Sequence, residues 1–327
     1  MLSRKWNLTQ VRLPVMASNY SRQAGKILLA SILLLAPFLG TPARSALREL
    51  APVRIKGSFV IAAICKDGII VASDSRGMLK DSQGRRIAYY EVNQKIFPVA
   101  NNLIADTGYA SLNDARISFL SALMSRFAES PVARVEVDKL PASYFAYADS
   151  VLGATGAESA MVQTLVFAGF KEDRPILCIY EGESSRATKC RSSGYLSSPK
   201  EEIFGLQKVG SLSFAEAAQV MQKTIDDYAA AVQPGSVGGP VVMRIITRSD
   251  SKWFGVRPDW PNWESFTDLA DDYRNRRVLF FLMPGISKVE LDELIDEGAN
   301  WARLGMTANS EKPKVNAPVI GSHPPDR

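Results

Sequence analysis

Three polar residues near the start of the chain have the types needed to activate a nucleophile. Ser58 supplies a hydroxyl, Asp74 a carboxylate and Lys95 an ammonium group. A weak hydroxyl nucleophile needs an adjacent base or a neighbouring charge before it can attack a carbonyl carbon. These residues therefore indicate a candidate nucleophilic site. The alternative is an ordinary antiparallel sheet whose polar residues only mark the ends of strands.

The elements around these residues predict that they lie at the ends or edges of adjacent strands. Phe59–Ile64 has the apolar composition of a buried strand, and Ile69–Ser73 is its return strand, which ends on Asp74. Between them, the Asp-Gly pair of Lys66-Asp67-Gly68 supplies the positive φ that a tight hairpin turn needs. A third element then brings in Lys95, directly before Ile96-Phe97.

The same stretch resembles the beginning of mature proteasome β-type subunits. In that family a Gly–Thr bond is cut, so that the threonine becomes a free N-terminal nucleophile. The resemblance covers roughly residues 57–247. The motifs that carry it are, in order, Gly57-Ser58, Lys66-Asp67-Gly68, Ala72-Ser73-Asp74-Ser75-Arg76, Lys95-Ile96-Phe97 and Thr107-Gly108, with Asn113-Asp114 standing about two residues late for the last motif. A longer loop at Lys80–Arg86 accounts for the late position of Lys95.

The resemblance assigns a role to each matching residue. Ser58 is the nucleophile, its freed amine relays protons, and Lys95 lowers the pKa of the hydroxyl. Asp74 holds the lysine charged, because an opposite charge nearby favours the ionised form of each partner. The backbone N–H of Gly108 stabilises the oxyanion, Ser193 supports the amine and Arg76 is structural. The alternatives are a plain Asp74–Lys95 ion pair and a turn glycine at Gly108.

The match to the family has departures that bear on activity. The nucleophile is serine where the family has threonine, and Ser192-Ser193-Gly194 is only similar to the family's Gly-Ser-Gly. Before Gly238-Gly239, Pro234 replaces an aspartate and Val237 replaces a serine, with Ser236 one place away. We therefore keep three hypotheses: a hydrolase of peptide or other amide bonds, an inactive binding or scaffold protein on the same fold, and an acylase-like enzyme acting on a small amide.

The composition excludes several other classes of protein. The only histidine, His323, lies in a tail, so a Ser-His-Asp arrangement is not expected. Zinc sites use histidine or clustered cysteine, and we expect neither a metal nor a cofactor. Six of the basic residues lie within residues 1–45, and the remainder has 33 basic and 34 acidic residues, so a nucleic-acid partner is not implied. The remaining candidate bases are a lysine, a carboxylate or an N-terminal amine, whose pKa of about 7.7–8.0 suits proton transfer.

The first part of the chain has the pattern of an export signal. An apolar run at Ile27–Leu39 follows Arg22 and Lys26, and small residues precede a predicted cut near Ser45–Ala46. The run is short for a membrane span, so we expect a membrane-bound protein only if this segment is not removed. The predicted organisation is a signal peptide at 1–45 and a propeptide at 46–57, with a periplasmic or extracellular location.

The rest of the chain predicts an α+β fold, which the resemblance specifies as a four-layer αββα sandwich of two antiparallel sheets. We expect the hydrolase domain at 58–250, an extension at 251–304 that contains a helix, and a disordered tail at 305–327. Proteasome relatives form rings, and the extension could block or replace contacts between copies. The expected elements are strands at 103–107, 163–170, 175–180, 241–247 and 278–283, and helices at 110–129, 140–152, 213–232 and 287–304.

The three cysteines suggest one disulfide bond. Cys178 and Cys190 are symmetric about a turn near Ser184, so they could pair across a hairpin in an oxidising compartment. The alternative is two unpaired cysteines in strands. Cys65 is expected to be a small buried residue.

Overall fold

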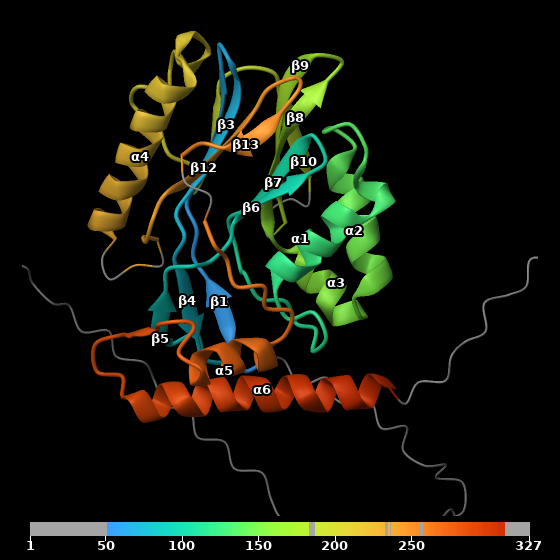
Figure 1. Ribbon diagram of the computed structural model, residues 1–327, viewed down its shortest axis with the longest axis vertical. Helices are drawn as coiled ribbons and strands as arrows, with labels where there is room; N and C mark the ends of the chain where they lie inside the picture. Colours follow the sequence, from blue (N-terminus) through green and yellow to red (C-terminus); the bar gives the residue numbers. More distant parts are fainter. Residues whose placement is uncertain (1–50, 183–186, 233–234, 236, 256–257, 311–327) are drawn as a thin grey trace, which may run out of the picture. The chain divides into compact units, whose positions relative to one another are not determined.

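The protein has a mixed α+β fold with three antiparallel sheets (Figure 1). The computed structural model describes residues 51–182, 187–232, 235, 237–255 and 258–310, all within one compact unit, residues 50–327. The expected signal peptide, the turn at Ser184, Pro234, Ser236, His323 and residues 311–327 lie outside these described ranges. In the described part, no helix is long and apolar enough to span a membrane.

The first five-stranded sheet contains the predicted hairpin. Its order is β11-β2-β3-β12-β13, with bounds Tyr195–Ser198, Val60–Cys65, Gly68–Ser73, Val242–Ile246 and Ser251–Trp253. The turn between β2 and β3 is confirmed, because β2 and β3 pair from Val60↔Ser73 to Cys65↔Gly68, and Gly68 has a φ of 140°. The backbone at Gly68 also passes close to Ile246, so a side chain would not fit there.

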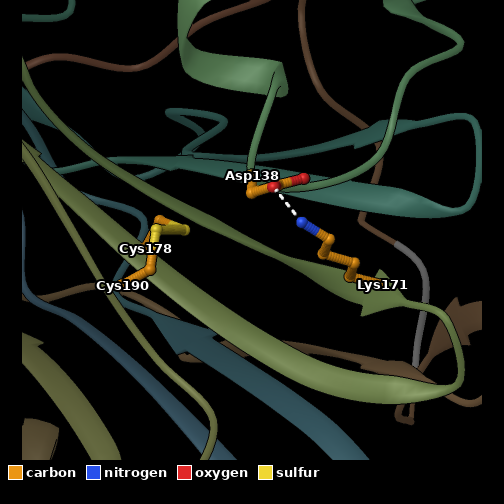
Figure 2. The surroundings of a disulfide bond; sticks show 4 residues. All are labelled: Asp138, Lys171, Cys178 and Cys190. Atoms are coloured by element: carbon orange, nitrogen blue, oxygen red, sulfur yellow. Dashed lines mark hydrogen bonds and ion pairs between the residues drawn. A yellow bond between two sulfur atoms is a disulfide. The ribbon is translucent and has the colours of Figure 1, made fainter.

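The second five-stranded sheet has the order β10-β9-β8-β7-β6. Its strands are Thr188–Arg191, Arg174–Glu181, Thr164–Lys171, Asn102–Asp106 and Ile96–Val99. Cys190 lies opposite Cys178 in the β10–β9 pair, and the predicted disulfide bond between them is confirmed (Figure 2). Cys65 is buried and free, as expected. An ion pair of 2.7 Å between Lys171 and Asp138 connects β8 to the segment before helix α2, which spans Leu140–Val151.

The third sheet was not predicted from the sequence. Its order is β1-β4-β5-β14, formed by Arg54–Lys56, Gly77–Lys80, Arg86–Tyr90 and Phe281–Leu282. It joins residues from the expected propeptide, from the segment between Asp74 and Lys95, and from the C-terminal extension. Only the last strand lies where a strand was expected, within 278–283.

The six α-helices of the described part cover different sheets. Their bounds are Leu120–Glu129 (α1), Leu140–Val151 (α2), Ala154–Met161 (α3), Phe214–Ala231 (α4), Phe266–Arg274 (α5) and Lys288–Ser310 (α6). Figure 1 shows α4 on one side of the sheets and α1 to α3 on the other, with α5 and α6 beside β1, β4 and β5. The predicted capping box that opens α4 is present, since Ser213 and Glu216 each bond the other's backbone N–H.

Two helix predictions need correction. The expected helix at 110–129 begins only at Leu120, because Asp114 accepts bonds from the N–H groups of Arg116 and Ile117 and forms a turn instead. Helix α6 continues to Ser310 rather than ending near 304, so the expected tail is helical over its first residues. The short helix α3 was not predicted.

Alternating residues of β2 explain how the two five-stranded sheets are buried on both faces. Val60, Ala62 and Ile64 pack in a cluster that also contains Leu103, Val166 and Ile179 of the second sheet. Ile61 and Ala63 point the other way, into a cluster with Met221 and Ile225 of α4. A strand that is apolar on both faces belongs between two layers, and this burial positions the polar residues at its end.

Candidate functional site

Ser58 lies in the short connection between β1 and β2. Its side chain is nearly buried, and its Oγ donates a hydrogen bond of 2.7 Å to the carbonyl oxygen of Gly57. Gly57 has a φ of 124°, a conformation that favours glycine, and its N–H donates to the carbonyl oxygen of Gly108 at 3.4 Å. The hydroxyl that could attack and the carbonyl it would attack are therefore neighbours in a turn that suits glycine.

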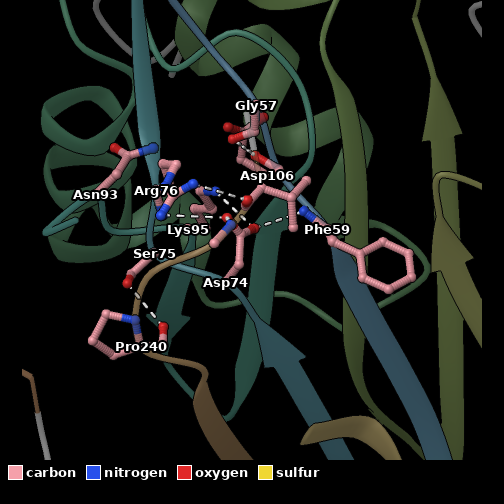
Figure 3. Close-up of polar contacts among 12 residues, drawn as sticks. Gly57, Phe59, Asp74, Ser75, Arg76, Asn93, Lys95, Asp106 and Pro240 are labelled. Carbon is pink, nitrogen blue, oxygen red and sulfur yellow. Dashed lines mark hydrogen bonds and ion pairs between the residues drawn. The ribbon is translucent and has the colours of Figure 1, made fainter. Parts of the chain in front are cut away.

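Asp74 connects Ser58's neighbour to the rest of the site. Its Oδ1 accepts from the N–H of Phe59 at 2.7 Å and from Nζ of Lys95 at 2.8 Å. Its Oδ2 accepts from the N–H groups of Arg76 at 3.2 Å and Gly238 at 3.0 Å. Figure 3 shows Asp74 at the centre of these contacts. Four donors around one buried carboxylate satisfy its hydrogen-bonding capacity and fix its position.

Lys95 and Asp74 form an ion pair whose side chains are both fully buried. Burial lowers the pKa of Lys95, and the adjacent Asp74 charge acts in the opposite direction. The contact between these two residues that was predicted from the sequence is present in the structure. No hydrogen bond joins Lys95 to Ser58 Oγ in the described structure, because the hydroxyl faces the Gly57 carbonyl and the ammonium faces Asp74.

Gly108 does not have a free N–H in this conformation. Its N–H donates to Oδ1 of Asp106 at 3.0 Å, while the next N–H, of Tyr109, donates to Oε1 of Gln163 at 2.8 Å. Gln163 also lies so close to Gly108 that a Cβ there would meet its Oε1 at 2.6 Å. The predicted oxyanion donor is thus beside Gly57 but is already bonded to a carboxylate.

Asp106 is the site residue that the sequence analysis missed. It ends β7 and is almost completely buried, and its own N–H donates to the carbonyl oxygen of Lys95. Burial raises its pKa to about 7, although the N–H of Gly108 and the charge of Lys95 act against this rise. Its signal in the sequence was a carboxylate at the end of a strand, two residues before Gly108, in the same kind of position as Asp74.

Arg76 has a structural role, as the sequence suggested. Its guanidinium pairs with Glu91 at 2.6 Å, stacks over the ring of Tyr89 and donates to the carbonyl oxygen of Val237. Gly238 passes so close to this guanidinium that a Cβ would lie 2.5 Å from Arg76 Cζ. These contacts bring the 237–240 segment to Asp74, and Pro234 and Ser236 lie outside the described residues.

The prediction for Ser193 is wrong. Strand β11 runs antiparallel to β2, with Tyr195 opposite Ala63 and Ser198 opposite Val60. Ser193 therefore lies beyond the far end of β2, exposed, and about 20 Å of strand separates that end from Ser58. The serine at the near end is Ser198, whose Oγ is 2.7 Å from Oγ1 of Thr107.

A cavity of about 470 Å³ adjoins the site next to Gly108. Its lining is mostly apolar, and it is shared by residues before Ser58, by the segment after Gly108 and by α3. Lining residues include Val53, Tyr109, Leu112, Ala154, Val162 and Gln163. Among the described residues, no three histidine, cysteine, aspartate or glutamate side chains are grouped as metal ligands.

Comparisons with known proteins give a distant structural likeness and no match to a family model or a curated protein. Among solved structures, it is similar to a Gly-1 mutant of Anbu from Hyphomicrobium sp. strain MC1, with 12% sequence identity and a TM-score of 0.42. The match covers 80% of this chain and 100% of the Anbu chain. A likeness at this level assigns no activity to this protein.

Proposed function

We propose that this protein is a proteasome-like N-terminal-nucleophile hydrolase, which cuts its own Gly57–Ser58 bond and then cleaves peptide or other amide bonds. The supporting observation is the position of Ser58. Its Oγ lies 2.7 Å from the Gly57 carbonyl oxygen, and the N–H of the next residue, Phe59, donates to Asp74 of the buried Asp74–Lys95 ion pair. We further propose that the two five-stranded sheets and their helices form a four-layer αββα sandwich, to which the third sheet is added.

The proposed cut proceeds in two steps. Ser58 Oγ adds to the carbonyl carbon of Gly57, the Gly57–Ser58 C–N bond breaks, and the hydroxyl proton passes to the departing nitrogen of Ser58. The product is an ester between Gly57 and Ser58 Oγ. Water then adds to this ester and the C–O bond breaks, which leaves a Gly57 carboxylate, a Ser58 hydroxyl and a free Ser58 amine. A glycine at residue 57 favours the first step because it places no side chain beside the carbonyl that is attacked.

The freed amine then serves as the base for other substrates. An α-amino group has a pKa of about 7.7–8.0, so it can take the hydroxyl proton at neutral pH and return it to the leaving amine. The positive charge of Lys95 favours the alkoxide that develops on Ser58. Gly108 can stabilise the oxyanion only after its N–H leaves Asp106, and protonation of Asp106 weakens that competing bond.

The second candidate is a binding protein with the same fold and no activity. Two observations favour it: the N–H of Gly108 is bonded to Asp106, and the residues before Ser58 are built into a sheet. In this case Asp74 and Lys95 form a buried ion pair that fixes the packing of β3 and β6. We also propose export, with the protein acting outside the cytosol, and association of copies if the C-terminal extension permits it.

The experiment that separates the two candidates is the intact mass of the purified mature protein, measured under denaturing conditions. For a hydrolase we expect wild type and Ser58→Thr to begin at residue 58, because both have a hydroxyl there. Ser58→Ala should retain the residues before 58, and Ser198→Ala should be cut like wild type, since Ser198 is not the nucleophile. A wild-type protein with an intact Gly57–Ser58 bond would refute the hydrolase proposal and favour the binding protein.

A further inference from the structure

The residues before Ser58 are held by hydrogen bonds from several parts of the chain. We call residues 51–57 the leading segment. Its strand β1 pairs antiparallel with β4, with Ile55 opposite Leu79. The carbonyl oxygen of Ile55 accepts from the N–H of Ala110 at 2.8 Å, and its N–H donates to Oγ of Ser111 at 3.0 Å. Strand β1 is therefore held along both edges, by β4 on one side and by residues 110–111 on the other, as a strand inside a sheet would be.

Three apolar side chains of the leading segment are buried like those of the central strands. Ile55 is 0% exposed, Val53 is 1% exposed and Ala51 is 7% exposed. The N–H of Ala51 also donates to Oδ1 of Asn113 at 2.8 Å. A segment that is meant to dissociate would bury little apolar surface, because exposing that surface to water opposes release. The burial seen here favours retention.

The C-terminal extension covers the leading segment. Val53 and Ile55 belong to one apolar cluster with Trp263, Phe266, Leu294 and Ala299. Gly298 of α6 lies directly against Val53, so that a Cβ at this glycine would be 2.7 Å from Val53 Cγ2. The absence of a side chain at residue 298 leaves the space that Val53 fills. Helices α5 and α6 of the extension therefore pack closely against the leading segment.

Cutting Gly57–Ser58 removes none of these contacts. These bonds and apolar contacts are non-covalent, they join residues 51–56 to parts of the chain after residue 58, and none of them involves the Gly57–Ser58 peptide bond. We infer that residues 51–57 are a permanent strand of this protein, bound by a surface made of β4, the 108–113 segment and helices α5 and α6, and that this surface keeps them after the cut. The cut itself rests on the proposed function.

Retention has a direct effect on the candidate site. The N–H of Gly57 stays bonded to the carbonyl oxygen of Gly108, so the new Gly57 carboxylate remains beside Ser58. Approach to the nucleophile along this strand is closed while the segment is bound. The processed protein therefore differs from a hydrolase whose propeptide leaves, because other substrates must reach Ser58 from a side that the segment does not cover.

Two measurements on the full-length protein test the inference. Native and denaturing mass spectra of the purified protein show whether the segment stays bound after the cut. We expect the native mass to contain both pieces and the denaturing spectrum to separate them. Hydrogen exchange of the peptide that contains Ile55 is measured in parallel, and we expect it to be as slow as that of β2. A processed protein whose native mass lacks the segment overturns the inference.

Substitutions in α6 test whether the extension is responsible for retention. In Gly298→Leu the new side chain takes the space of Val53, so we expect loss of the segment from the processed protein and exchange at Ile55 at least tenfold faster. Glu297→Leu adds the same side chain at the neighbouring exposed position and should leave both unchanged. In the double variant Gly298→Leu/Val53→Ala, the smaller residue 53 should partly restore slow exchange.

The outcomes for the two proposals are distinct. If Gly57–Ser58 is intact in wild type, the self-cutting hydrolase fails, and hydrogen exchange alone decides whether the segment is a permanent strand. Slow exchange at Ile55 then supports the inference. Exchange at the rate of an unfolded peptide, or identical behaviour of Gly298→Leu and Glu297→Leu, overturns it whether or not the bond is cut.

Discussion

The buried carboxyl of Asp106 gives a test in which both sign and size follow from the structure. Besides burial, the groups that act on its pKa are the ammonium of Lys95 and the N–H groups of Gly108 and Thr107. The substitution is Asp106→Asn. It keeps the size of the side chain and an oxygen that can accept from Gly108, and it removes the ability to ionise.

The direction of the pH dependence follows from the raised pKa of Asp106. Its ordinary value is 3.8 and burial raises it to about 7, so the folded state prefers the protonated form. The contribution to stability is therefore fully present below about pH 4 and is lost as pH rises through about 7. A difference between these two pKa values corresponds to at most about 4 kcal/mol at 1.36 kcal/mol per unit. We expect the free energy of unfolding of wild type, relative to that of Asp106→Asn, to fall by about 1–4 kcal/mol as pH rises from about 4 to about 8.

The assay is chemical denaturation of both proteins at several values between about pH 4 and about pH 8. Asp114→Asn serves as a control of opposite sign, because three backbone N–H groups lower the pKa of Asp114 despite its partial burial. A group of that kind stabilises the protein above its unfolded pKa and loses its effect as pH falls. The reasoning is refuted if the difference between wild type and Asp106→Asn is the same at every pH.

Three further predictions concern the ion pair, the disulfide bond and one close contact of the backbone. Lys95→Met should lower the free energy of unfolding by about 3–5 kcal/mol, measured with denaturant, because it leaves the buried Asp74 carboxylate without its ion partner. The double variant Asp74→Asn/Lys95→Met should regain part of that loss. A double variant whose loss equals the sum of the two single losses would contradict this. Cys178→Ser/Cys190→Ser should lower the free energy of unfolding by about 2–3 kcal/mol, because the disulfide joins residues 12 apart in the chain. Both proteins are measured with and without reductant, and the reductant should destabilise only wild type. Gly169→Ala should cost more than about 1 kcal/mol in thermal unfolding, because a Cβ at residue 169 would overlap Oδ1 of Asn102. Gly210→Ala is the control, because a Cβ there meets no atom within 4 Å and Gly210 is not among the positive-φ glycines; equal losses would contradict the contact.

Local chemistry explains which parts of the fold could be predicted from the sequence. The hairpin at Asp67-Gly68, the capping box at Ser213 and the cysteine pair each depend on residues close in the chain. The third sheet could not be predicted as a whole, because β1 and β14 come from segments far from the β4–β5 hairpin and tertiary packing decides their pairing with it. The helix expected at 110–129 failed for a local reason that the apolar spacing does not show, the turn around Asp114.

The candidate site shows the same division. Asp74 and Lys95 were brought together correctly because one ends a strand of a local hairpin and the other precedes the next strand. Ser193 was wrong because the register between β11 and β2, which are far apart in the chain, decides which serine reaches the site. Asp106 was missed because nothing in its neighbours indicates that burial would raise its pKa or that it would bind the N–H of Gly108.

The apolar cluster that joins Val53 and Ile55 to Trp263 and Ala299 also sets an order of events during synthesis. The ribosome releases the chain from its N-terminus, so the first strand waits for its covering until the last helix has been made. A chain that stops before residue 263 leaves Val53 and Ile55 without α5 and α6 and is expected to be recognised by chaperones and proteases. The same strand leads into the Gly57–Ser58 turn, so the proposed cut would depend on α5 and α6 and would occur only in chains long enough to contain them.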